Sequence, residues 1–512
     1  MALPDSAGEA KKCAAMMSER QGYKSIIKAT SLFGGVQVFN IMIALVRSKF
    51  IALFIGPTGM GISSLLVATI NLMGALTNLG LDRSGVKEIA SSTSGRDTAT
   101  RQETLSVLHT LFWLTSVVGM ILLFAMAPWI SLWVFEDAGY TNAVRAVALA
   151  LFFRQLTQGK LTQLQGLRKL GGLAKANLWG NLIALVLTVP LYYLYALDAI
   201  VPAIVIGSVL SFIVTAYIAK KESLSVSLMG INEAWQKGQP MIRLGVMLSL
   251  SSLITLVVGY MIQLFISGQG GLDQVGLYNA GFVILNTYVG LVFTAMGTDY
   301  FPRLTEVVDQ LEKARSTVTA QAFVAMVLIL PIIVVFLSLA PWIIEVLYTQ
   351  EFLAIVPMVT WGILGMLFKA VSFSLGYVLI AKGDSKLFIK TAVGFNAVLL
   401  TFNILGYHYG GLEGLGMSFL AYYVIHLVAI SIIVKKRYQL HLPKAFFGLF
   451  LLGLLCCVAA FGVTFMTAGW GQISLKVLII VITCLFSLYH LDQKLGLKDL
   501  LSKRMDRNNG NN

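Results

Sequence analysis

The sequence predicts an all-α polytopic membrane protein with about fourteen transmembrane helices, in which two six-helix lobes are related by an internal repeat and followed by a C-terminal helix pair. Three observations predict this fold. Hydrophobic residues make up 57% of the 512 residues, whereas charged residues make up only 12%. Long apolar stretches recur along the chain, and identical residues return at a fixed spacing of 215.

The apolar stretches define the predicted membrane spans, because a transmembrane helix needs about 20 mostly apolar residues. The polar segment before the first stretch has no apolar core with a small-residue cleavage site, so it does not resemble a signal peptide. It is predicted to be a cytoplasmic tail. The fourteen predicted spans are 25–47, 59–81, 104–127, 142–162, 177–196, 199–219, 243–266, 275–297, 317–340, 354–378, 389–407, 412–434, 445–467 and 473–489.

The recurring residues divide these spans into two copies. Because each copy has six spans, both have the same orientation and are related by an axis along the membrane normal. The residues repeated at 215 are Gly61 with Gly276, Asn71 with Asn286, Lys175 with Lys390 and Asn181 with Asn396, while APWI at 127–130 returns at 340–343, a spacing of 213. The predicted parts are a tail (1–24), an N-lobe (25–219), a cytoplasmic linker (220–242), a C-lobe (243–434), the C-terminal pair (445–489) and a second cytoplasmic tail (490–512).

The formal net charge of +14 follows the predicted topology. With the N-terminus placed in the cytoplasm, nearly all of the 38 lysines and arginines fall on the cytoplasmic side, which fits the positive-inside rule. Both termini are therefore expected in the cytoplasm, and neither a nucleic-acid partner nor a cofactor is expected. The exceptions are Arg47, Lys49, Arg145, Arg154, Lys369 and Lys476.

Arg154 and Lys369 are the most informative residues, because each lies in the middle of a predicted span and they are 215 residues apart. A charge at that depth costs roughly 2.5–3.5 kcal/mol on insertion scales. None of the 24 acidic residues falls in the middle of a predicted span to act as a partner; Glu413, for example, lies at the very start of one. Carbonyl groups, water or snorkelling could satisfy the two cations. A central cavity that binds an anionic cargo would satisfy them better.

Other polar residues within the spans extend this candidate binding site. Gln37, Asn40 and Arg47 share one face of the first span. Their spacings of three and seven residues keep side chains on the same side of a helix. Asparagines at this depth either contact the cargo or hold helices together. The candidate substrate-binding residues are Arg47, Lys49, Arg154, Lys369, Gln37, Asn40, Asn71 and Asn286.

The run at 29–66 resembles the start of Wzx-type polysaccharide flippases, which belong to the multidrug/oligosaccharidyl-lipid/polysaccharide exporter superfamily. The resemblance lies in a basic residue, Arg47, followed by a turn that contains Gly56, Pro57, Gly59 and Gly61. It implies a flippase for undecaprenyl-pyrophosphate-linked oligosaccharide, such as an O-antigen repeat unit, in the bacterial inner membrane. It also implies alternating access about a cationic cavity. Membrane lipids, a polysaccharide polymerase and a chain-length regulator are the implied partners.

Several alternatives stay open at this point. Fourteen spans also fit the lipid II flippase branch of the superfamily. A cation-coupled multidrug or metabolite antiporter is disfavoured because it needs a buried carboxylate. No enzymatic activity is expected, because the predicted outer loops are too short for a catalytic domain and no phosphate-binding GxxxxGK[ST] motif occurs. A scaffold without transport activity would not explain the repeated cations.

Overall fold

The computed structural model describes residues 6–94, 98–222, 226–467 and 469–495, with no side-chain description for residues 6–38, 93, 94, 98, 298, 494 and 495. Over these ranges the chain forms helices and turns and contains no strand, which confirms the all-α prediction. The helices are α1 (Ser6–Thr77), α2 (Leu81–Ser94), α3 (Thr98–Phe135), α4 (Thr141–Gly166), α5 (Leu170–Tyr195), α6 (Ile200–Lys221), α7 (Ile231–Val283), α8 (Leu291–Val307), α9 (Leu311–Leu347), α10 (Val356–Ala381), α11 (Ser385–Tyr438), α12 (Lys444–Val463) and α13 (Trp470–Leu495).

Nine helical stretches of the described chain are long and apolar enough to cross a membrane, judged by length and composition. Four of these stretches each contain two of the predicted spans, because a kink or short turn joins the two helices. The predicted span 142–162 lies in α4, which is not among those nine stretches. The helices thus accommodate all fourteen predicted spans of a multi-pass membrane protein.

The backbone repeats the 215-residue spacing at the points where helices break. Gly56 and Gly271 interrupt α1 and α7 with φ values of 61° and 78°. Ala196 and Gly411, with φ values of 46° and 55°, end α5 and interrupt α11. Left-handed φ values are rare outside glycine. Their return at one spacing shows that the two copies share backbone geometry as well as residues.

The chain forms two compact units, of which the first comprises residues 1–50, 70–130 and 139–250. Within it α5 packs against α6, and α4 contacts both α6 and α2. A small apolar core joins α2 to α3 through Leu81, Ile89, Leu108 and Phe112, all of which are buried. This packing holds α4, which carries Arg154, beside the end of α1.

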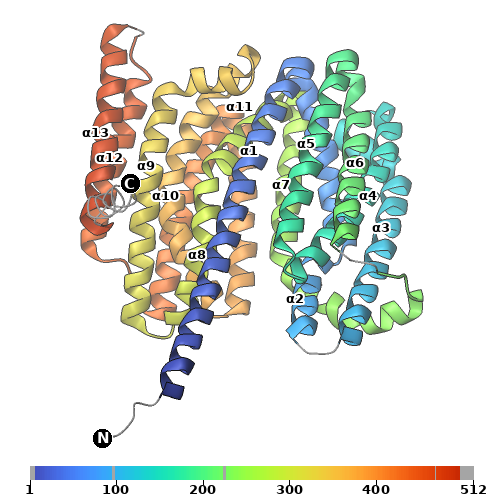
Figure 1. The fold of residues 1–512 in the computed structure, drawn as a ribbon. Coiled ribbons are helices and arrows are strands. Elements are labelled where there is room, and N and C mark those ends of the chain that lie inside the picture. The colour runs from blue at the N-terminus through green and yellow to red at the C-terminus, as the bar shows by residue number, and fades with distance from the viewer. Residues whose placement is uncertain (1–5, 95–97, 223–225, 468, 496–512) are drawn as a thin grey trace, which may run out of the picture. The chain divides into compact units, whose positions relative to one another are not determined.

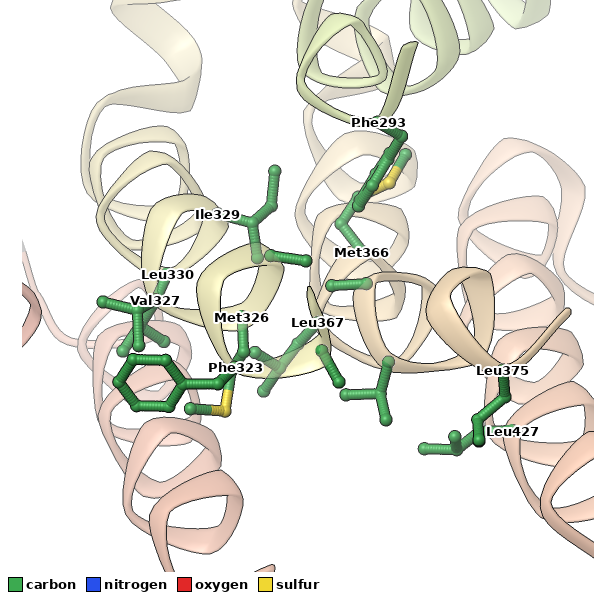
Figure 2. Packing of buried hydrophobic residues seen from close by; sticks show 14 of the residues in the cluster. Phe293, Phe323, Met326, Val327, Ile329, Leu330, Met366, Leu367, Leu375 and Leu427 are labelled. Carbon is green, nitrogen blue, oxygen red and sulfur yellow. The ribbon is translucent and has the colours of Figure 1, made fainter. Parts of the chain in front are cut away.

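The second unit comprises residues 51–69, 131–138 and 251–512. Its large core is formed where α9 meets α10, with additional side chains from α8 and α11, as Figure 2 shows for Met326, Leu367, Phe293 and Leu427. The C-terminal helices α12 and α13 lie side by side against α9 (Figure 1). The core fixes α10, which carries Lys369, between α9 and α11.

A helix crossing within the second unit brings the two copies of the repeat into contact. A Cβ atom on Gly61 would lie 1.9 Å from the carbonyl oxygen of Leu272, and one on Gly276 would lie 1.9 Å from that of Pro57. Both pairs are symmetric under the 215-residue spacing. One helical turn away, Asn279 donates a hydrogen bond to Ser64, its own counterpart, at 2.9 Å. Contacts between equivalent residues show that the repeat axis passes through this crossing.

Candidate functional site

The two cations singled out by the sequence make the same contact in each copy of the repeat. Arg154 on α4 donates a hydrogen bond to the side-chain oxygen of Asn71 on α1, at 3.3 Å. Lys369 on α10 donates to the side-chain oxygen of Asn286, at 3.0 Å. Donor and acceptor are 83 residues apart in both pairs. Each copy therefore carries one cation–asparagine pair at an equivalent place.

Neither cation is neutralised by an acidic side chain. Within the described part of the chain, no salt bridge involves Arg154 or Lys369. An ammonium has three N–H donors and a guanidinium has five, and the side chain of each residue makes a single hydrogen bond, the one to asparagine. Both side chains are at least partly accessible. The remaining donors are free to bind an anion or water.

Aromatic rings surround the ammonium of Lys369. It lies over the rings of Phe293, Phe419 and Tyr423, at 5.5, 5.9 and 5.3 Å from their centroids. Cation–π contacts contribute about 0.5–2 kcal/mol each, with the larger values at desolvated sites. Together with the Asn286 hydrogen bond, they offset much of the cost of placing a charge at this depth. These contacts therefore stabilise the charged form of Lys369.

A cavity of about 500 Å³ opens beside Lys369 and Asn286. Its walls are largely aromatic, with Phe293, Phe373 and Tyr377 packed against one another at centroid distances of 4.8–5.5 Å. A few polar groups among aromatic walls are typical of a small-molecule site. The cavity offers one cation, amide and hydroxyl hydrogen-bonding groups, and flat apolar surfaces.

The backbone next to this cavity is irregular. Ile284–Val289 forms a single π-helical turn that contains Asn286, and the turn ends at Gly290. A Cβ on Gly290 would lie 2.0 Å from the carbonyl oxygen of Asn286, so this geometry requires glycine. Asn286 itself is oriented by a 3.4 Å hydrogen bond from its side-chain nitrogen to the carbonyl of Phe282. Such π-turns are frequent at functional sites.

The first unit brings a second arginine to Arg154. Arg47 on α1 lies close enough to Arg154 for the two charges to repel each other, and it also faces the ring hydroxyl of Tyr192. Asn40, about two turns before Arg47 along α1, accepts a 3.2 Å hydrogen bond from Asn181. Lys49 is partly buried near the end of this segment. The side chain of Gln37 lies outside the described residues.

The predicted turn residues occupy the start of the second segment of α1. Gly56 provides the break, and Pro57 follows it at the first position of the new segment, where proline needs no hydrogen-bonding N–H. Gly59 is buried, and Gly61 forms the helix crossing. The motif therefore lies at the kink of α1 and at the helix crossing. Its last residue, Gly61, precedes Asn71 by ten residues.

The sequence analysis did not identify the aromatic side chains that surround the ammonium of Lys369. Phe419 and Tyr423 come from α11, and only the packing of α10 against α11 brings them to the ammonium. The asparagine contacts did leave a signal, because Asn71 and Asn286 precede their cations by the same number of residues. That common offset pairs each asparagine with its cation.

Comparison with known proteins adds a family and a fold. Residues 50–357, more than half of the chain, match the family model described as polysaccharide biosynthesis protein. A lipid III flippase of Escherichia coli is 22% identical over 404 residues, which cover 78% of this chain and 96% of that protein. A Shigella flexneri protein provisionally named as an O-antigen transporter is 23% identical over 334 residues, covering 64% and 78% of the two chains.

Two solved structures share the fold. The lipid II flippase MurJ in an inward closed conformation superposes with a TM-score of 0.70 and 13% identity, over 91% of this chain and 99% of that chain. An inward-facing multidrug resistance MATE family transporter of the MOP superfamily gives a TM-score of 0.61 and 14% identity, over 84% and 98%. At these identities the likeness concerns the fold alone.

Proposed function

Since the chain belongs to the polysaccharide biosynthesis protein family, we propose that it is a flippase for undecaprenyl-pyrophosphate-linked oligosaccharide. It would carry a surface-polysaccharide repeat unit, such as that of an O-antigen, across the bacterial inner membrane. The family match and the names of its sequence relatives support the lipid-linked saccharide class. The lipid II flippase alternative rests on a shared fold.

The observation that carries this proposal is the repeated cation–asparagine pair. A pyrophosphate is an anion with several acceptor oxygens, and it suits cations that have free N–H donors and no carboxylate partner. Arg154 and Lys369 meet that description, and Arg47 adds a third positive charge near Arg154. Hydrogen bonds from charged donors are stronger than neutral ones, by roughly twofold.

The cavity beside Lys369 suits the saccharide part of the cargo. Its phenylalanine and tyrosine rings are flat apolar surfaces on which the C–H face of a sugar can pack. Asn286, Thr294 and Tyr377 offer hydrogen-bonding groups to sugar hydroxyls. The polyprenyl chain needs no polar contact and stays in the lipid. We place a phosphate of the headgroup at Lys369 and a sugar against this aromatic wall.

Alternating access is the transport mechanism that fits an internal repeat. In this proposal the two copies rock about their axis, and the breaks at Gly56 and Gly271 let α1 and α7 bend in equivalent ways. The chain performs no covalent chemistry on the cargo, so it is a transporter and not an enzyme. A cytoplasmic position of both termini and partnership with a polymerase and a chain-length regulator belong to the same proposal.

A cation-coupled drug antiporter is the rival function, because a MATE transporter shares the fold. Such a transporter needs an acidic group for its cationic drug and coupling ion. The described surroundings of Arg154 and Lys369 hold no such group in contact with either residue. The two positive charges would repel a cationic drug.

Transport by the purified, reconstituted protein tests the proposal. Proteoliposomes that contain a fluorescent lipid-pyrophosphate oligosaccharide should show protein-dependent loss of inner-leaflet label. Arg154→Gln and Lys369→Gln should each slow this loss at least tenfold. Arg145→Gln, which removes an arginine that packs on Phe124 instead, should not. Export of cationic dyes together with unchanged lipid transfer by both variants would refute the proposal.

A further inference from the structure

A second polar cavity lies at the junction of α11 and α12, in the second unit. It has a volume of about 420 Å³. Ser431 and Lys435 line it from the last turns of α11, while His441 and Lys444 line it from the connection and the first residue of α12. Leu440 and Phe447 contribute apolar walls. The cavity is thus lined by two lysines and a histidine together with apolar side chains.

The lysines of this cavity have no acidic partner in the described part of the chain. Both are exposed. The nearby Arg437 differs, because it reaches Asp384 at 3.4 Å. The first turn of α12 adds amides without a side-chain cap, since Pro443 occupies the cap position. Uncapped amides at a helix start favour an anion.

The depth of the cavity identifies its ligand class. Lys435 directly follows the predicted span 412–434 and Lys444 directly precedes the predicted span 445–467, so both are expected at headgroup level. Basic cavities between helices at this level bind anionic lipid headgroups. Phe447 lies one helical turn into the span and is exposed, which places an apolar wall where an acyl chain begins.

We propose that this cavity binds the headgroup of an anionic glycerophospholipid of the bilayer, with its phosphate held by Lys435 and Lys444 and an acyl chain against Phe447. A volume of about 420 Å³ accommodates a phosphodiester headgroup. The site is separate from both cation–asparagine pairs, and it does not depend on the transport function. The positive-inside bias places it in the inner leaflet.

Lipid retention by the full-length protein tests the site. The protein is purified in detergent and titrated with dioleoyl-phosphatidylglycerol or dioleoyl-phosphatidylcholine, and bound lipid is counted by native mass spectrometry. Wild-type protein should retain phosphatidylglycerol selectively. The double variant Lys435→Gln/Lys444→Gln should bind it about 30-fold more weakly, because each lysine near an anionic headgroup contributes about 1 kcal/mol.

A matched control removes the same charge elsewhere. Lys386→Gln/Lys436→Gln loses two exposed lysines of α11 that do not line the cavity, and it should retain the lipid as wild type does. Ser431→Phe keeps both lysines and fills the cavity, so it should also weaken lipid binding. This variant still tests the site if the double lysine variant does not fold. Equal loss in the control, absence of selectivity for phosphatidylglycerol, or preferential binding of polyprenyl phosphate would each overturn the proposal.

Discussion

Replacement of Asn286 by leucine separates the stability of the Lys369 site from its role in transport. Leucine has nearly the shape of asparagine but accepts no hydrogen bond, so the ammonium loses its 3.0 Å contact and keeps only its aromatic neighbours. A hydrogen bond to a charged group contributes about 1.5–3 kcal/mol. We therefore expect Asn286→Leu to lower the free energy of unfolding by about 2 kcal/mol.

The double variant Asn286→Leu/Lys369→Met should reverse that loss. Removal of both polar partners leaves an apolar pair of similar volume, and such exchanges are often neutral or stabilising. Transport by the double variant should not recover, because the cation that would hold the cargo is gone. Stability would thus fall and recover across the series, while transport would fall and stay low.

Thermal unfolding in detergent and the proteoliposome assay measure the two quantities on the same preparations. For a chain of this length, 2 kcal/mol corresponds to a shift of about 2 °C in apparent Tm. Asn71→Leu and Asn71→Leu/Arg154→Met repeat the experiment in the other copy, and the same pattern is expected. Wild-type transport by Asn286→Leu/Lys369→Met would show that the cation is structural, and the reasoning would fail.

Two further predictions concern the backbone. Gly61→Ala should destabilise the protein by about 1–3 kcal/mol, because its methyl group would overlap the carbonyl of Leu272. The control Gly259→Ala, whose methyl group would face open space, should be neutral or slightly stabilising in the same unfolding assay. Ala196→Gly should raise stability by about 1 kcal/mol, since φ of 46° is unfavourable for alanine, whereas Ala125→Gly in an exposed helical position should lower it by about 0.5–1 kcal/mol. A destabilised Ala196→Gly protein would contradict the strain argument.

The fold was largely predictable because its main signals are local. Apolar stretches of membrane length mark every span, and the spacing between Asn71 and Asn286 identifies the repeat. The structure extends that repeat to positions where residue identity differs. Ala196 and Gly411 share a left-handed backbone although only one is glycine. A comparison of residue types cannot detect such a pair, because the information lies in the backbone conformation.

The candidate site was predictable in part for the same reason. A charge in an apolar stretch is visible in the sequence, so Arg154 and Lys369 could be singled out. What compensates those charges depends on which helices pack together. Phe419 approaches Lys369 only through the contact between α10 and α11, and the π-turn around Asn286 depends on one extra residue per turn. Neither feature has a periodic signature.

The glycine crossing and the cation–asparagine pairs are linked along the chain. Asn71 follows Gly61 by ten residues on α1, and Asn286 follows Gly276 by the same number across the end of α7 and the π-turn. Because backbone touches backbone at the crossing, its angle can change without repacking of large side chains. Each asparagine is joined to its cation by one side-chain hydrogen bond. The crossing glycines and the cation–asparagine pairs thus keep the same spacing along the chain in both copies, as an internal repeat with equivalent cation sites requires.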